Sequence, residues 1–268
     1  MFQLPKEGCF YQRSQSIIRS WEDLPKLREG PSAPPSIEQQ IKKVQEALDA
    51  VKGLNIAVGV HLRSVICNTY SVMGFANFSK KLFTDRKLVE AVMDEFLNYS
   101  VKMAEAVSKL DIDFFFFDDD IADSHGTILP PRLIEELWIP RSEMILKPIK
   151  RKNIPVLYHC CGKLDDVIPM IIEMGIKAIH PIQPSCNDIY AIKKKYGDEI
   201  CLMGNIDIAG VLAFGTPREV IKDAKKHIEK LASGGGYIAG SSHSITDVIP
   251  PENFAAMIKA IQTYGLYK

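Results

Sequence analysis

Short apolar runs alternate with longer amphipathic stretches along most of this chain, and this alternation limits the folds open to it. The apolar runs occupy residues 55–62, 113–118, 154–159, 176–182, 200–206 and 236–242. Helical spacing fills the intervals, as in "DRKLVEAVMDEFLNYSVKMAEAVSKL" and "TPREVIKDAKKHIEKLAS". Continuous apolar strands that alternate with helices indicate a parallel sheet with helices packed on it. We therefore expect one α/β domain.

The N-terminal part lacks this alternation. Residues 1–36 show no regular spacing, and "EGPSAPPS" is typical of a proline-rich hinge. Helical spacing begins at "IEQQIKKVQEALDAVKG", which Ser36 is placed to cap and Gly53 to end. The predicted organisation is an irregular segment, 1–36, followed by a barrel domain, 37–268.

Polar or reactive side chains follow five successive apolar runs. They are Asp118, Asp119 and Asp120; His159, Cys160 and Cys161; His180 and Gln183; Asn205 and Asp207; and Ser241, Ser242 and His243. In a parallel barrel the carboxyl ends of the strands converge on one face, whereas a doubly wound sheet spreads them along a crevice. Five clusters in register favour the barrel and predict a functional pocket at its C-terminal face.

Composition excludes several classes of function. The 33 basic and 33 acidic residues cancel, so no global field attracts nucleic acid or an anionic membrane. The sequence contains no run of 18 apolar residues, and its first residues lack the apolar core of a signal peptide. Six dispersed cysteines do not form a disulfide framework. We expect a cytoplasmic protein that binds neither nucleic acid nor membrane.

The stretch "LYHCCGK" predicts a metal-binding corner at the end of a strand. His159 and Cys161 are two positions apart, so their side chains point to the same side of an extended strand end, and imidazole and thiolate are ligands of zinc. Cys160 then points into the packing layer, where a thiol behaves as a small hydrophobe. Gly162 permits a tight turn into the next helix.

A third ligand must come from another strand end. His243 is the nearest chemical match, and Asp120 is the oxygen alternative. Three consecutive carboxylates after four phenylalanines form either a solvated loop with a helix cap or a pocket-facing group, because burying unpaired ions costs several kcal/mol each. We favour the second interpretation and predict that Asp119 or Asp120 is catalytic.

The other strand ends supply candidate substrate contacts. His61 and Arg63 end the first strand and are placed to touch an anionic substrate. The remaining candidates for the polar lining are His180, Gln183, Asn205 and Asp207. His227, with Lys and Glu neighbours on a predicted helix, is expected to be exposed.

Three segments resemble the uroporphyrinogen decarboxylase superfamily, which includes zinc methyltransferases that exchange methyl groups with corrinoid proteins. They are "LYHCCGKLDDVIPMIIEMGIKAIHPIQP", "IKKKYGDEICLMGNIDIAGVLAFGTPREV" and "GGGYIAGSSHSITDVIPPENFAAMIKAI". The resemblance implies a (β/α)8 TIM barrel. His159 and Cys161 match the His-x-Cys-Gly motif of the methyltransferases, so the resemblance also implies that these two residues bind zinc. Many members have a further Cys near the last strand, and this chain has His243 at that position.

The chain departs from the family in two ways. The arginine-rich N-terminal motif of the decarboxylase is missing, and about six of eight strand–helix units are present, so the predicted barrel is incomplete at its N-terminus. Such a barrel is open, or closed by a partner chain, or completed by another polypeptide. Exposed strand edges favour association, for instance as a homodimer.

The resemblance implies a zinc-dependent methyltransferase that exchanges a methyl group between a small methylated substrate or thiol and a corrinoid carried by a partner protein. Two alternatives remain. One is a metal-free decarboxylase, which needs a cationic site, for which His61 and Arg63 are the candidates. The other is a truncated, non-catalytic subunit of a corrinoid methyltransferase system.

Overall fold

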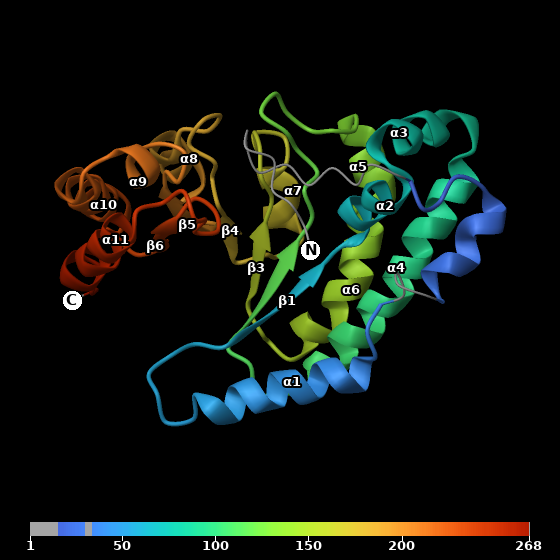
Figure 1. Ribbon diagram of the computed structural model, residues 1–268, viewed down its shortest axis with the longest axis horizontal. Helices are drawn as coiled ribbons and strands as arrows, with labels where there is room; N and C mark the ends of the chain where they lie inside the picture. The colour runs from blue at the N-terminus through green and yellow to red at the C-terminus, as the bar shows by residue number, and fades with distance from the viewer. Residues whose placement is uncertain (1–15, 30–33, 268) are drawn as a thin grey trace.

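Six parallel strands form one sheet in sequence order in the computed structural model, which describes residues 16–29 and 34–267 (Figure 1). The strands are β1 (Gly59–Arg63), β2 (Phe114–Asp118), β3 (Val156–His159), β4 (Ala178–His180), β5 (Cys201–Ile206) and β6 (Tyr237–Ser241). Each coincides with one of the six apolar runs. Since helices follow every strand, the fold is a TIM-barrel-like α/β fold, as predicted.

Helices precede, connect and follow the strands within the described residues. They are α1 (Ile37–Ala50), α2 (Val65–Met73), α3 (Phe75–Thr84), α4 (Arg86–Val107), α5 (Pro131–Leu137), α6 (Ile139–Arg151), α7 (Ile168–Glu173), α8 (Ile189–Tyr196), α9 (Val211–Phe214), α10 (Pro217–Leu231) and α11 (Pro251–Tyr264). Figure 1 shows α4 packed with α6 near one end of the sheet and α10 packed with α11 at the other. None of the helices in the described ranges is both long and apolar enough to cross a membrane.

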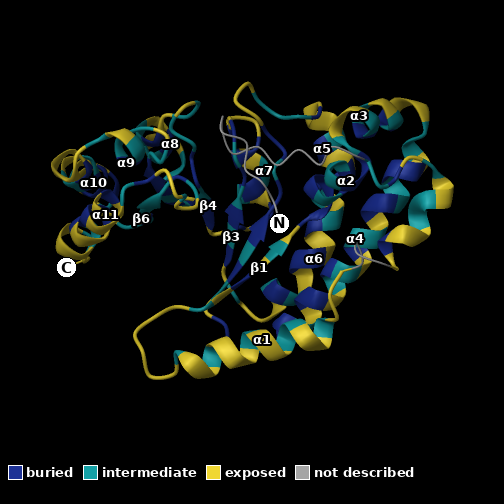
Figure 2. Cartoon of the chain, viewed as in Figure 1, coloured by how far each residue is buried: buried dark blue, intermediate teal, exposed yellow. Residues whose placement is uncertain are grey.

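Within the segment 1–36, predicted to be irregular, residues Trp21–Leu27 form a 3₁₀ helix, η1, which the sequence pattern does not predict. Two interactions stabilise this helix. The Asp23 carboxylate accepts hydrogen bonds from two backbone amides at the start of the helix. The side chain of Leu27, at its other end, is buried. Residues 1–15 and 30–33, including most of the proline-rich hinge, lie outside the described residues. Helix α1 buries none of its residues and presents a largely exposed surface (Figure 2).

Alternation along the strands separates the packing face from the pocket face. On β2, Phe115 and Phe117 are fully buried in the main core, and on β3 so is Tyr158. Burial of each such aromatic side chain stabilises the fold by about 2–3 kcal/mol. The intervening residues Phe116 and His159 lie on the inner face and remain partly exposed.

The register aligns the strand ends in one row. Arg63 pairs with Asp118, Asp118 with His159, and His159 with His180. In a parallel sheet, residues in register project from the same face, so these four side chains are neighbours across β1 to β4. Within the described residues, β1 and β6 pair with a neighbouring strand on one side only.

Candidate metal centre

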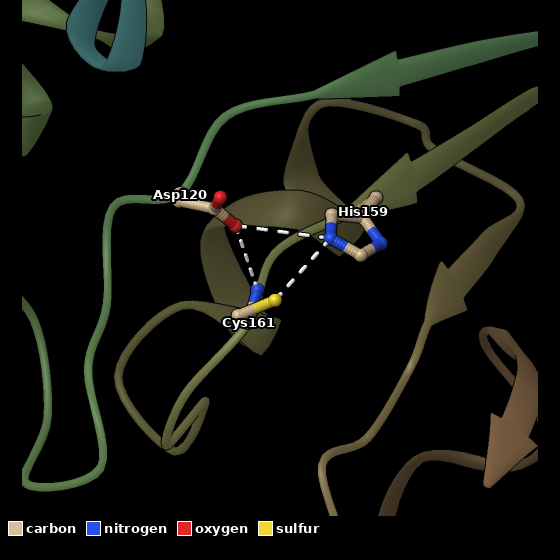
Figure 3. Close-up of side chains that lie close together, drawn as sticks. All are labelled: Asp120, His159 and Cys161. Carbon is tan, nitrogen blue, oxygen red and sulfur yellow. Dashed lines mark hydrogen bonds and ion pairs between the residues drawn. The ribbon is translucent and has the colours of Figure 1, made fainter. Parts of the chain in front are cut away.

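The His-Cys corner lies at the end of β3, where the two side chains point to the same side (Figure 3). Cys161 Sγ lies 3.4 Å from His159 Nε2. Cys160, between them, is fully buried in the core, as the alternation of side chains predicts. The corner therefore presents one thiol and one imidazole nitrogen to the inner face.

Asp120 reaches this corner from the loop between β2 and α5. Its Oδ1 accepts a hydrogen bond of 3.0 Å from the backbone N–H of Cys161 and lies 3.8 Å from His159 Nε2 (Figure 3). One donor atom from each of the three residues lies within 4.8 Å of the other two. Ligand atoms bound tetrahedrally at about 2.0–2.3 Å from one zinc ion lie about 3.3–3.8 Å apart, and His159 Nε2 lies 3.4 Å from Cys161 Sγ and 3.8 Å from Asp120 Oδ1. The donor set therefore fits a metal ion with only small adjustments.

His243 reaches the same thiol from the end of β6. Its Nε2 lies 3.2 Å from Cys161 Sγ, and its ring is 6.5 Å from the ring of His159 in an edge-on arrangement. Both residues that the sequence offers as a third ligand, Asp120 and His243, therefore lie at the corner.

Gly162 turns the chain away from the corner in a conformation that other residues rarely adopt, with φ at +92°. Its N–H donates a 3.0 Å hydrogen bond to Gln183 Oε1, and its carbonyl accepts one of 2.8 Å from Asn187. The Gln183 amide also donates to Ser185 Oγ. Both polar atoms of the Gln183 side chain, which was predicted to line the substrate site, are therefore hydrogen-bonded within the protein, and one of them holds this turn.

The three consecutive carboxylates after β2 differ in environment. Asp119 is fully buried, and its carboxylate accepts hydrogen bonds of 3.0 and 2.6 Å from the amides of Ile66 and Cys67 at the start of α2. Burial, together with the charges of Asp118 and Asp120, raises the pKa of Asp119 to about 7 despite these two donors. Asp119 therefore caps a helix, and Asp120 is the carboxylate at the corner.

Replacing Asp119 with alanine is expected to lower the free energy of unfolding by about 3 kcal/mol, because two buried amides lose their acceptor. Asp119→Asn keeps a neutral acceptor and should cost less. Urea unfolding of both variants measures this order. A stable Asp119→Ala variant would contradict the capping role assigned here.

Asp118 pairs with both cationic candidates of the first strand. Its carboxylate, 2% exposed, lies 2.8 Å from Arg63 Nε and 2.5 Å from His61 Nε2. Burial opposes ionisation of Asp118, but these two partners outweigh it and lower its pKa. Both His61 and Arg63 therefore contact a carboxylate of the protein itself.

The remaining candidate residues lie apart from the thiol or face another side chain. His180 Nδ1 lies 2.7 Å from His159 Nδ1. Asn205 and Asp207 line a hollow of about 360 Å³ together with residues of α8, α9 and α10. His227 also lines this hollow and is 9% exposed, so the expectation that it is exposed was wrong. The ring of Tyr190, 5.6 Å away, covers it.

Burial is the main influence on the pKa values of the Cys161, His159 and His243 side chains at the corner. It raises the pKa of the Cys161 thiol, and the charge of Asp120 raises it further. Burial lowers the pKa values of His159 and His243, so both imidazoles favour the neutral form that binds metals. A thiol beside a carboxylate needs a nearby positive charge to ionise, and a divalent cation held by the same atoms supplies it.

The sequence profile described as uroporphyrinogen decarboxylase (URO-D) matches residues 12–264. This chain belongs to that family. Among relatives of this URO-D family member, "Methylcobamide:CoM methyltransferase MtbA" of Methanosarcina mazei is 22% identical over 269 residues, covering 97% of this chain and 74% of the relative. "Uroporphyrinogen decarboxylase" of Legionella pneumophila is 27% identical over 143 residues, covering 53% of this chain and 39% of the relative.

A solved structure of a "methyltransferase from Methanosarcina mazei" superposes with a TM-score of 0.68 at 17% identity. The match covers 94% of this URO-D family member and 69% of the solved chain. At this identity the likeness shows the fold. Family members include both methyltransferases and decarboxylases, so the chemistry of the site must separate the two activities.

Proposed function

We propose that this chain is a zinc-dependent methyltransferase that exchanges a methyl group between a corrinoid protein and a small methylated substrate or thiol. The observation that carries the proposal is the convergence of Cys161 Sγ and His159 Nε2, 3.4 Å apart, on the inner face of the sheet. The match to the relative named methylcobamide:CoM methyltransferase covers 97% of this chain. It supports a methylcobamide as methyl donor and a thiol as acceptor.

His159 Nε2 and Cys161 Sγ would hold the zinc ion, with Asp120 or His243 as the third ligand. When bound, zinc acts as a Lewis acid that lowers the pKa of a thiol so that the nucleophilic thiolate forms at neutral pH. With three ligands from the chain, such a centre would have room for the substrate thiol.

The residues of the chain itself hold this centre open to substrate. The side chains of His159 and Asp120 are 19% and 31% exposed, so solvent and small molecules reach the corner. The hydrogen bond from the Cys161 amide fixes the Asp120 carboxylate beside the thiol. That carboxylate is placed to accept the proton that an incoming thiol loses, provided that it is not itself the third ligand.

The pairing of Asp118 argues against a metal-free decarboxylase. A substrate that carries several carboxylates needs unpaired cations in its site. The two candidates for this task, His61 and Arg63, share the Asp118 carboxylate. This arrangement favours methyl transfer over decarboxylation.

Two measurements on the purified chain test the proposal. Elemental analysis should find about one zinc ion per chain. With methylcobalamin and coenzyme M as probes, absorbance should then report loss of the methyl–cobalt bond. The thiolate sulfur gains the methyl group, cobalt(I) keeps the electron pair, and the thiol proton is released to solvent. Absence of both zinc and transfer would overturn the proposal, and zinc without transfer would favour the non-catalytic subunit.

A further inference from the structure

One side of β6 has no neighbouring strand among the residues that the structure describes. The pairing with β5 decides which peptide groups face this open side. The Leu202 amide donates a 3.1 Å hydrogen bond to the carbonyl of Gly236, and Tyr237 is the register partner of Leu202. In a parallel pair, alternate residues of one strand bond the same neighbour. The peptide groups of Tyr237, Ala239 and Ser241 therefore face the open edge.

The side chain of Tyr267 occupies the first of these three positions. Its hydroxyl donates a hydrogen bond of 2.8 Å to the Tyr237 carbonyl and accepts one of 3.3 Å from the Tyr237 amide. One phenol thus engages both the donor and the acceptor that Tyr237 would offer to an added strand. Tyr267 lies three residues beyond α11 and is 59% exposed, so it reaches the edge from the surface.

The rest of the edge is suited to pairing with another strand. The outward N–H and C=O of Ala239 have no hydrogen-bond partner within residues 16–29 and 34–267. Ile238, beside it, is 41% exposed. Unpaired amides next to an exposed apolar side chain make an edge strand a template for another chain. Because β6 has only five residues, engaging Tyr237 removes one of its three outward positions.

We propose that Tyr267 blocks the open edge of β6 against pairing with a second copy of this chain. A second copy carries the identical edge, and a two-fold axis brings the two β6 strands together as antiparallel neighbours. Bonds between the copies at Tyr237 form only after the phenol has left on both chains. The association that an open sheet favours is therefore opposed by a contact within the chain itself.

Removing a single hydroxyl tests this block. Tyr267→Phe keeps the ring and deletes both hydrogen bonds, whereas Tyr264→Phe makes the same change at the end of α11. Sedimentation equilibrium over a series of protein concentrations measures the association constant. We expect Tyr267→Phe to raise this constant by roughly 10-fold or more, because dimerisation no longer displaces two hydrogen bonds on each chain. The constant of Tyr264→Phe should equal that of the wild type.

A proline shows whether the association uses this edge. Ala239→Pro removes an N–H that faces away from β5, so the pairing between β5 and β6 is retained. Added to Tyr267→Phe, this change should return the association constant to the wild-type value or below it. An association constant that the proline leaves unchanged would place the contact elsewhere and overturn the inference.

Hydrogen exchange of the Tyr237 amide tests the contact without association. At concentrations where both proteins are monomeric, we expect this amide to exchange faster in Tyr267→Phe than in the wild type, since its acceptor is gone. Equal exchange rates, or equal association constants for the two proteins, would contradict the block. Neither measurement depends on zinc or methyl transfer, so this inference and the proposed function stand or fall separately.

Discussion

Replacing Cys161 with alanine is expected to weaken zinc binding by at least about 100-fold. The thiol is the donor on which the other groups converge, with His159 Nε2 at 3.4 Å and His243 Nε2 at 3.2 Å. Loss of a partner that merely orients a ligand costs roughly 10–100-fold in affinity, so loss of a ligand exceeds this range. Chelator competition and elemental analysis measure the effect, and methyl transfer should fall with zinc occupancy.

The neighbouring cysteine provides a matched control. Cys160→Ala removes the same atoms one position earlier, but this thiol is fully buried in the core. We expect a loss of stability of about 1–2 kcal/mol from the small cavity, with zinc affinity within a few-fold of wild type. Zinc retained equally by both variants would remove Cys161 from the centre.

Replacing Gly162 with alanine is expected to displace the corner and to lower stability by more than about 2 kcal/mol. The positive φ alone costs roughly 1–2 kcal/mol for a residue with a Cβ. An added Cβ would also lie 2.5 Å from the carbonyl oxygen of Asp123, a backbone atom that cannot rotate away. Because Cys161 immediately precedes this turn, zinc affinity should fall together with stability.

Replacing Gly175 with alanine distinguishes the cost of backbone strain from the cost of the steric clash that is expected at Gly162. Its φ is +71°, but an added Cβ meets no atom within 4 Å. Gly175→Ala should therefore show only the cost of the left-handed backbone, about 1–2 kcal/mol, with zinc affinity unchanged. Urea unfolding and chelator competition on the two variants give the comparison. Equal effects of the two substitutions on zinc affinity would refute the contact with Asp123.

The sheet and the His-Cys corner could be predicted because both follow from local alternation. Apolar runs of the right length mark the strands, and a period of two residues directs His159 and Cys161 to one side and Cys160 to the other. Neither inference depends on how distant parts of the chain meet.

The roles of the loop residues could not be predicted because they depend on distant partners. Asp119 and Asp120 are adjacent in sequence, yet the first accepts amides of α2 and the second accepts the amide of Cys161. His227 is buried because Tyr190 of another helix covers it. The local sequence pattern identifies a side chain that needs a hydrogen-bond or packing partner. Which residue serves as that partner follows only from the three-dimensional fold.

One row of side chains runs across the sheet, perpendicular to the strands, and each of its residues belongs to a different strand. These residues are Arg63, Asp118, His159 and His180. Lengthening a helix between two strands leaves this row intact. Inserting a single residue within β3 ahead of His159 would instead turn that imidazole to the outer face. The place of His159 in this row therefore depends on the spacing within β3 and not on the length of the connections between the strands.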